Sequence, residues 1–164
     1  MPRRRLPRPP GDERRTAAEA ALRAAIALLA RRDLPSAELR EKLRAQAFDE
    51  ATAAEVIAEL TRQGTLNDER YARNYVIYHA GRGQGPVRIA AELRRRGLSA
   101  EVAEAALAGG PDWGELARKV CRARFGPEPP ASWLLKARQA RFLQYRGFSS
   151  DHIRAATGAD PDLD

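Results

Sequence analysis

A repeat of fifty residues is the feature that most constrains how this chain can fold. Leu43, Leu93 and Leu143 occupy one position of the repeat. Each leucine is followed at the same distance by a large apolar residue and then by a polar residue that can cap a helix: Phe48 with Asp49, Leu98 with Ser99, and Phe148 with Ser149. Three agreements at a single offset predict three equivalent structural units. A unit this small has little core of its own, so neighbouring units are expected to stack and share apolar surface.

The residues between these positions predict helices. Ala and Leu dominate the apolar residues, both are good helix formers, and β-branched residues are few. Proline- and glycine-rich breaks divide the chain into helix–helix–turn–helix units. The fold class predicted is therefore all-α, with three tandem three-helix, helix-turn-helix-like repeats. The predicted division is a disordered basic arm at 1–15, repeats at 16–65, 66–110 and 111–158, and a frayed tail at 159–164.

Local signals place the ends of several helices. Ser36, Asp49, Ser99 and either Ser149 or Ser150 are predicted to cap the helices that follow them. Gly64 is placed to end a helix in the left-handed conformation. The corner from Gly81 to Pro86, GRGQGP, lacks the GK[ST] ending of a phosphate loop and does not follow a strand. It is interpreted as a flexible connection between two helices, or as a loop that lets Arg82 and Arg88 approach a phosphate backbone.

The charge of the chain favours an acidic partner. The net charge is +7, and Arg greatly outnumbers Lys. Residues 16–65 are balanced, with seven basic and eight acidic side chains, whereas residues 116–148 hold eight basic side chains and only one acidic side chain, Glu128. The basic surface is therefore expected in the second and third units. A GC-rich genome, which enriches Ala and Arg without any functional reason, is the alternative explanation.

Few residues suggest catalysis. His79 and His152 lie far apart without Cys or carboxylate neighbours at metal-ligand spacing, and the single cysteine, Cys121, lies on a helical apolar stripe. No Ser/His/Asp arrangement or nucleophile elbow is visible. We therefore predict a protein that is not an enzyme, with no catalytic residue, no cofactor and no metal site. The absence of an apolar run or signal peptide predicts a cytoplasmic protein that is not bound to a membrane.

The predicted helices at 86–97 and 131–148 occupy corresponding places in the second and third repeats, and both are rich in basic residues. Together they make a continuous basic stripe a plausible binding surface. Its role would be charge complementarity to acidic protein surface or phosphate. Tyr78 is the tyrosine expected to be exposed, while Tyr71 and Tyr75 are expected in the core. The predicted contact set is Arg82, Arg88, Arg94, Arg95, Lys136, Arg138, Arg141 and Arg146. Because these helices expose mainly Arg, Glu and Ala, contact with a backbone or a protein surface is favoured over base readout.

Several segments, in their order and spacing, resemble the RecX regulatory proteins of bacteria. The resemblance runs from about Ala21 to Ile153. Its most specific pieces are Ala37-Glu38-Leu39 with Lys42-Leu43, Asp68 with Tyr71-Ala72 and Tyr75, Gly85-Pro86 with Ile89 and Leu93, and Arg146-Gly147-Phe148. The chain departs from the family at Ala47, where the first unit commonly has glycine.

The resemblance implies an elongated, curved molecule of three three-helix repeats. We also expect the protein to be a monomer. The resemblance further implies binding to the RecA recombinase, as monomer or filament, and negative modulation of its ATPase and strand-exchange activities. Family members are thought to lie along the filament groove and to contact single- or double-stranded DNA there, without sequence preference. The alternative function is a free-standing helix-turn-helix protein that binds nucleic acid, such as a transcriptional regulator.

Overall fold

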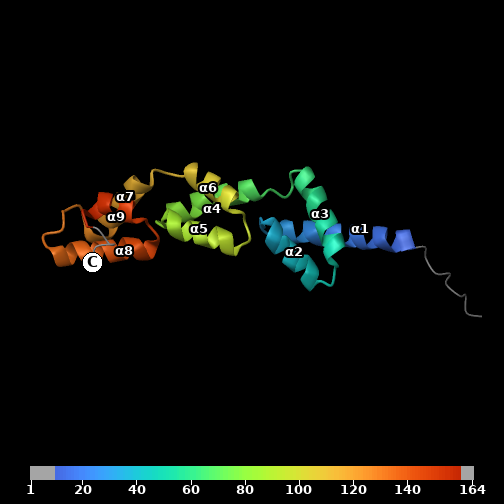
Figure 1. The fold of residues 1–164 in the computed structure, drawn as a ribbon. Helices are drawn as coiled ribbons and strands as arrows, with labels where there is room; N and C mark the ends of the chain where they lie inside the picture. Colours follow the sequence, from blue (N-terminus) through green and yellow to red (C-terminus); the bar gives the residue numbers. More distant parts are fainter. Residues whose placement is uncertain (1–9, 160–164) are drawn as a thin grey trace, which may run out of the picture. The chain divides into compact units, whose positions relative to one another are not determined.

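The computed structural model describes residues 10–159, with side chains from residue 11 onward. Within these residues the chain forms nine α-helices and no strand (Figure 1). Contacts divide it into two compact units, the first ending at Asp68 and the second beginning at Glu69. The first unit contains one predicted repeat, and the second contains the other two.

The first unit is a three-helix bundle. Its helices are α1 (Pro10–Leu29), α2 (Ser36–Ala45) and α3 (Glu50–Arg62), and α3 packs against both α1 and α2. Leu39, Leu43 and Leu60 are almost completely buried between them. Burying a leucine side chain contributes roughly 2 kcal/mol, so this core holds the three helices together.

The predicted disordered arm is wrong for residues 10–15, which form the first turns of α1. Proline is tolerated in the first turn because its missing N–H has no partner there in any case. Asp12 and Glu13 also lie in this first turn, where negative charge is favoured by the helix dipole. The rest of the arm, residues 1–9, lies outside the described residues, as do residues 160–164 of the predicted tail.

The predicted cap at Ser36 is also wrong. Pro35 occupies the N-cap position of α2, and Ser36 is the first helical residue. The Ser36 N–H and hydroxyl both donate to the carboxylate of Asp68, at 2.8 Å and 2.6 Å. The start of α2 is therefore capped by a carboxylate 32 residues away and not by the side chain of Ser36. A carboxylate suits this place because negative charge is stabilised at a helix N-terminus.

The second unit contains six helices built around two adjoining cores. They are α4 (Asp68–Gly81, of which Asp68 belongs to the first unit), α5 (Pro86–Arg95), α6 (Ala100–Ala108), α7 (Trp113–Phe125), α8 (Trp133–Arg146) and α9 (Ser150–Thr157). Leu116 packs against both cores, and the indole N–H of Trp113 donates to the Leu107 carbonyl at 3.2 Å. The predicted sharing of apolar surface is therefore confirmed between the second and third repeats.

The turn from the second to the third helix has the same backbone hydrogen bonds in all three repeats. The N–H groups of Phe48, Leu98 and Phe148 donate to the carbonyls of Leu43, Leu93 and Leu143, at 3.2, 3.2 and 3.1 Å. The residue before each of these donors has a positive φ: 67° at Ala47, 84° at Gly97 and 90° at Gly147. This is the Schellman pattern of a helix end. Asp49, Ser99 and Ser149 then cap the next helix, as predicted.

Candidate functional site

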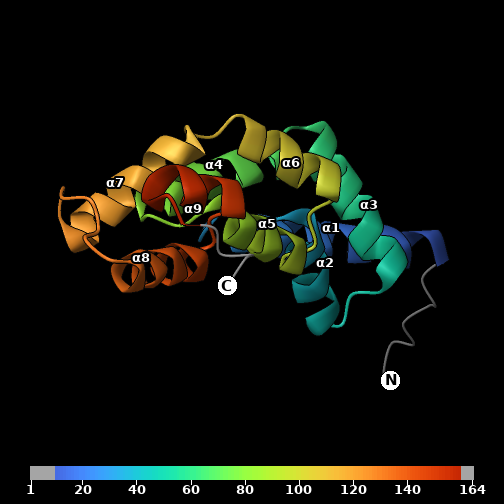
Figure 2. The same ribbon diagram turned by 60° about the vertical axis from the view of Figure 1, so that its left-hand side comes forward.

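Helices α8 and α5 meet end to end inside the second unit (Figures 1 and 2). The Gly85 N–H donates to the Arg146 carbonyl at 2.8 Å, and the Val87 N–H donates to the Gly147 carbonyl at 2.9 Å. The first amides of one helix thus bind the last carbonyls of the other, so each helix satisfies groups that the other leaves open. The two helix dipoles also align favourably, because the negative end of α8 meets the positive end of α5.

Two glycines allow this close approach. A Cβ atom on Gly85 would lie 2.3 Å from the Gly147 carbonyl oxygen, and one on Gly147 would lie 2.2 Å from the Arg88 Cβ. The corner that the sequence predicted as a flexible connection is therefore anchored at Gly85. It is also tied to the end of α4, because the Gln84 N–H donates to the His79 carbonyl at 3.1 Å.

All eight predicted contact residues lie in the second unit, on or beside the joined helices. Arg88, Arg94 and Arg95 belong to α5, and Lys136, Arg138, Arg141 and Arg146 belong to α8, while Arg82 follows α4 directly. Lys136 and Arg146 are half-buried, and the other six are exposed. The structure joins the α5 set to the α8 set through the helix junction, and the Arg146 guanidinium donates to the Arg82 carbonyl at 3.3 Å.

Five basic residues of the first unit differ in their partners from the predicted contact residues of the second unit. In the first unit Arg32, Lys42, Arg40, Arg44 and Arg62 all form ion pairs with glutamates. Of the eight predicted contact residues, only Arg95 pairs with a carboxylate in the described part of the chain, that of Glu92 at 2.9 Å. The other seven contact residues therefore present positive charge that no described carboxylate compensates, whereas Arg73, Arg118 and Arg154 of the same unit are paired with acidic side chains.

Exposed aromatic and apolar side chains accompany this charge. Tyr78 is exposed as predicted, at 59%, while Tyr71 is buried and Tyr75 is half-buried. The outer ridge of α8 consists of the predicted contact residues Arg138 and Arg141 together with Leu134 and Tyr145, which were not predicted to be exposed. Leu134 is 72% exposed and Tyr145 is 79% exposed. Their spacing of i, i+4, i+7 and i+11 places the four on one helical face, which was the available signal.

Comparisons with known proteins agree with this architecture. Three family models match in order along the chain: the first three-helix domain of RecX at residues 21–60, the second at 67–107 and the third at 114–157. The chain belongs to the RecX family. The predicted outer boundaries of the repeats stay predictions.

Curated RecX relatives align over nearly the whole chain. The regulatory protein RecX of Halorhodospira halophila is 42% identical over 149 residues, covering 90% of this chain and 92% of the relative. That of Stenotrophomonas maltophilia is 38% identical over 155 residues, covering 94% and 95%. The crystal structure of RecX from Lactobacillus salivarius has a TM-score of 0.77 at 24% identity, covering 91% of this chain and 99% of that one, and so supports the shared RecX fold.

Two titratable side chains of the second unit, His79 and Cys121, are packed against their neighbours. The His79 ring stacks on Tyr75 with 4.0 Å between centroids, and its Nδ1 lies 2.9 Å from the Gln84 side-chain oxygen. Burial lowers the pKa of His79, and the positive charges of Arg96 and Arg82 lower the pKa further. The hydrogen bond with Gln84 acts in the opposite direction and raises the pKa. Burial likewise raises the pKa of the Cys121 thiol. Neutral forms of both groups are therefore favoured, as in a structural role.

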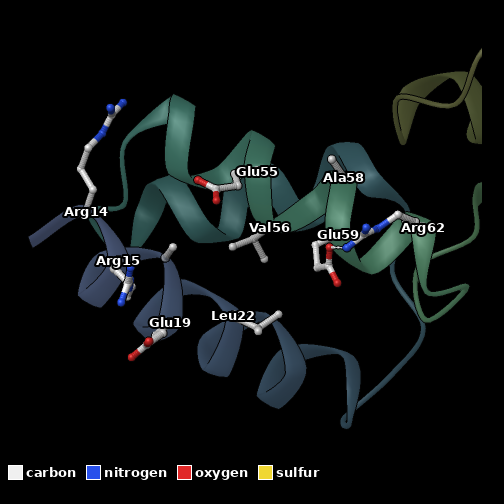
Figure 3. Close-up of a pocket in the computed structure, with 10 residues that line it drawn as sticks. Arg14, Arg15, Glu19, Leu22, Glu55, Val56, Ala58, Glu59 and Arg62 are labelled. Carbon is white, nitrogen blue, oxygen red and sulfur yellow. Dashed lines mark hydrogen bonds and ion pairs between the residues drawn. The ribbon is translucent and has the colours of Figure 1, made fainter. Parts of the chain in front are cut away.

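A wide groove lies in the first unit, between α1 and α3 (Figure 3). Its volume is about 960 Å³. Leu22 and Val56 supply apolar side chains from the two helices, and the rim carries both signs of charge, including the Arg62–Glu59 ion pair. No His, Cys, Ser or Thr lines it. Among residues 11–159 no group of three metal-ligating side chains comes together, and no described helix is long and apolar enough to cross a membrane.

Proposed function

We propose that this protein is a non-enzymatic regulator that binds the RecA recombinase, as a monomer or as a filament on DNA, and lowers its ATPase and strand-exchange activities. Membership of the RecX family supports the choice of partner. The observation that carries the mode of binding is the joined α8–α5 surface, where seven of the eight predicted contact residues have no carboxylate partner in the described chain. Such a surface attracts acidic protein or phosphate over a distance and aligns it along two helices.

The affinity of this surface comes from contacts that do not depend on base sequence. Arg88, Arg94 and Arg141 are exposed cations on helices that offer few amide or hydroxyl side chains for base edges. Arginine binds phosphate and carboxylate through a rigid fork of N–H donors. We therefore propose that DNA contacts, whether to single or double strands, are to the backbone, and that the protein acts as a monomer in the cytoplasm.

An ATPase measurement tests this function. RecA ATPase on single-stranded DNA is followed while this protein is added in amounts far below one copy per recombinase. Inhibition at such ratios is expected if the protein caps or enters filaments. The absence of any effect, together with tight sequence-specific binding to duplex DNA, would replace the proposal with the alternative of a free-standing transcriptional regulator.

The fifty-residue repeat supplies a matched control for the surface. Arg94 and Arg44 occupy equivalent positions, but Arg44 pairs with Glu41 and Glu50 whereas Arg94 forms no ion pair in the described chain. Arg94→Glu is expected to raise the concentration needed for inhibition roughly fivefold, the change produced by about 1 kcal/mol of lost attraction. Arg44→Glu is expected to change it little. Equal effects of the two variants would remove α5 from the contact surface.

A further inference from the structure

A small pocket lies where the second repeat meets the third. Its volume is about 260 Å³, and we call it the junction pocket. Its lining comes from the corner after α4, from α7 and from α8, and consists of Arg82, Gly83, Val120, Ala123, Arg124, Phe142 and Arg146. Three of these seven residues are arginines and none is acidic. Gathering like charges in one small space is unfavourable unless an anion compensates them.

Two of the three arginines are positioned by neighbouring side chains and backbone. The Arg146 guanidinium lies over the Phe142 ring at 5.3 Å and donates to the Arg82 carbonyl at 3.3 Å. The Arg82 guanidinium lies over the Tyr78 ring at 5.4 Å and donates to its hydroxyl at 3.1 Å. These contacts hold the side chains and still leave several N–H groups of each guanidinium for a ligand.

Arg124, the third arginine of the pocket, is not in the predicted contact set. It lies near the end of α7, where its guanidinium is 5.6 Å from the Phe125 ring centroid, and it is exposed. It forms no hydrogen bond and no ion pair with any described residue. Its five N–H donors are therefore available to a ligand at the pocket.

Gly83 keeps the space between these arginines open. It has a φ of +77°, a conformation that glycine adopts without strain. A Cβ atom there would lie 3.1 Å from Val120 Cγ2 and 3.8 Å from the Arg146 guanidinium nitrogen. A Cβ at this position would therefore press on Val120 of the pocket wall and come into van der Waals contact with Arg146.

We propose that the junction pocket binds one phosphate group of a nucleic-acid backbone. A phosphodiester presents oxygen acceptors that match the N–H donors of a guanidinium group, and the apolar wall of Val120 and Phe142 suits the adjoining sugar. A bound phosphate bridges residues of the second and third repeats and so fixes their junction. This inference rests on the proposed function, in which DNA is part of the complex.

Two neighbouring arginines on α7 provide the test. Binding of a fluorescein-labelled oligothymidylate is measured by anisotropy over a range of NaCl concentrations, without recombinase. Arg124→Gln is expected to weaken binding about fivefold and to lower the slope of log K against log salt by up to ~0.7, the value for one phosphate on a single strand. The control is Arg122→Gln, which removes the same charge from an exposed residue outside the pocket. Equal affinities and slopes for the two variants would overturn the proposal.

A second variant tests the pocket without removing an arginine. Ala123 is an exposed lining residue, so Ala123→Glu places a carboxylate at the pocket while leaving the core intact. We expect at least a tenfold loss of affinity, because the new carboxylate competes with the phosphate for the same guanidinium groups. Circular dichroism checks that the helices are retained. Affinity like that of Arg122→Gln would show that the pocket holds no phosphate.

A third arm distinguishes backbone phosphate from free polyphosphate. Tripolyphosphate is titrated into the protein, and the backbone amide of Gly83 is followed by NMR in parallel with the oligothymidylate. The proposal expects the amide to shift at oligonucleotide concentrations far below those needed with tripolyphosphate. A shift at similar phosphate concentrations would assign the pocket to free polyphosphate and overturn the nucleic-acid proposal. Because recombinase is absent throughout, neither result affects the ATPase test of the proposed function.

Discussion

The helix junctions of the first and third repeats have the same backbone but very different surroundings. Ala47 and Gly147 both take the left-handed conformation that closes a Schellman turn. Ala47 is exposed, whereas Gly147 is buried and its carbonyl accepts the Val87 N–H of the next repeat. One local motif therefore serves in the first repeat only to end a helix, and in the third repeat also to join two repeats.

This difference explains why alanine occurs at one copy and glycine at the other. An alanine in the left-handed conformation costs roughly 1–2 kcal/mol, a strain that a folded domain can absorb. At Gly147 a Cβ would in addition lie 2.2 Å from the Arg88 Cβ and 2.8 Å from the Arg88 backbone nitrogen. Neither atom can move without shifting the start of α5, so the third junction requires glycine for space as well as for conformation.

The largest expected effect is that of Gly147→Ala. We expect it to destabilise the second unit by about 3 kcal/mol, because overpacking against backbone is added to conformational strain. The matched change Gly97→Ala lies at the equivalent, exposed position and should cost about 1 kcal/mol. Urea unfolding followed by tryptophan fluorescence reports on this unit, because Trp113 and Trp133 both lie within it. Equal losses would show that the α8–α5 contact adds nothing to the requirement for glycine.

Ala47→Gly is expected to have a smaller effect of opposite sign, a gain in the stability of the first unit. The substitution relieves the left-handed strain at the first junction and should stabilise the first unit by about 1 kcal/mol, less the entropy that glycine gains when unfolded. No tryptophan lies in this unit, so amide hydrogen exchange in α2 and α3 is the suitable measurement. Slower exchange confined to these helices is the expected result, and faster exchange would show that Ala47 is not strained.

The smallest expected effect concerns the caps that follow the junctions. Asp49 caps α3, where Ser99 and Ser149 cap the corresponding helices, so only the first junction has an ionisable cap. The hydrogen bond from the Thr52 amide is the main cause that lowers the pKa of Asp49 below its ordinary value. Its stabilisation is therefore present above the ordinary aspartate pKa and is lost as pH falls through the lower pKa of the folded state.

Hydrogen exchange in α3 at acidic pH checks this prediction. Below about pH 4, exchange in α3 should accelerate more in the wild type than in Asp49→Ser, whose cap does not titrate. Identical pH profiles for the two proteins would mean that the Asp49 carboxylate does not support the helix.

Local patterns in the sequence were sufficient to predict most of the helices. The positions of Leu43, Leu93 and Leu143 and the caps after them follow from short-range periodicity, and the structure confirms them. The cap of α2 could not be predicted in this way. Its partner Asp68 lies 32 residues away, and any nearby hydroxyl is an equally good local candidate. The predicted arm reaches too far along the chain because the prolines before Pro10 obscure the acidic first turn of α1.

The candidate site was predicted less completely than the fold. The predicted contact set includes Arg88, Arg94 and Arg141, and all three side chains are exposed. The sequence did not indicate that Arg124 of α7 lies beside Arg82 and Arg146 at one pocket, because that proximity depends on how α7 packs against two other elements. The helical spacing of Leu134 and Tyr145 with Arg138 and Arg141 was a signal that they share a face, but apolar residues are by default expected in a core, so their exposure was not predicted.

The amino-acid sequence by itself determined the threefold repeat, the helices, and the concentration of basic residues in the second and third repeats. These properties depend on residues within one or two helical turns of one another. Only the tertiary structure decided what the glycines of the GRGQGP corner do. Gly85 is there because the Gly147 backbone comes within 2.3 Å of where its Cβ would be. That contact joins residues more than sixty positions apart, and it arises only when two complete repeats have packed together.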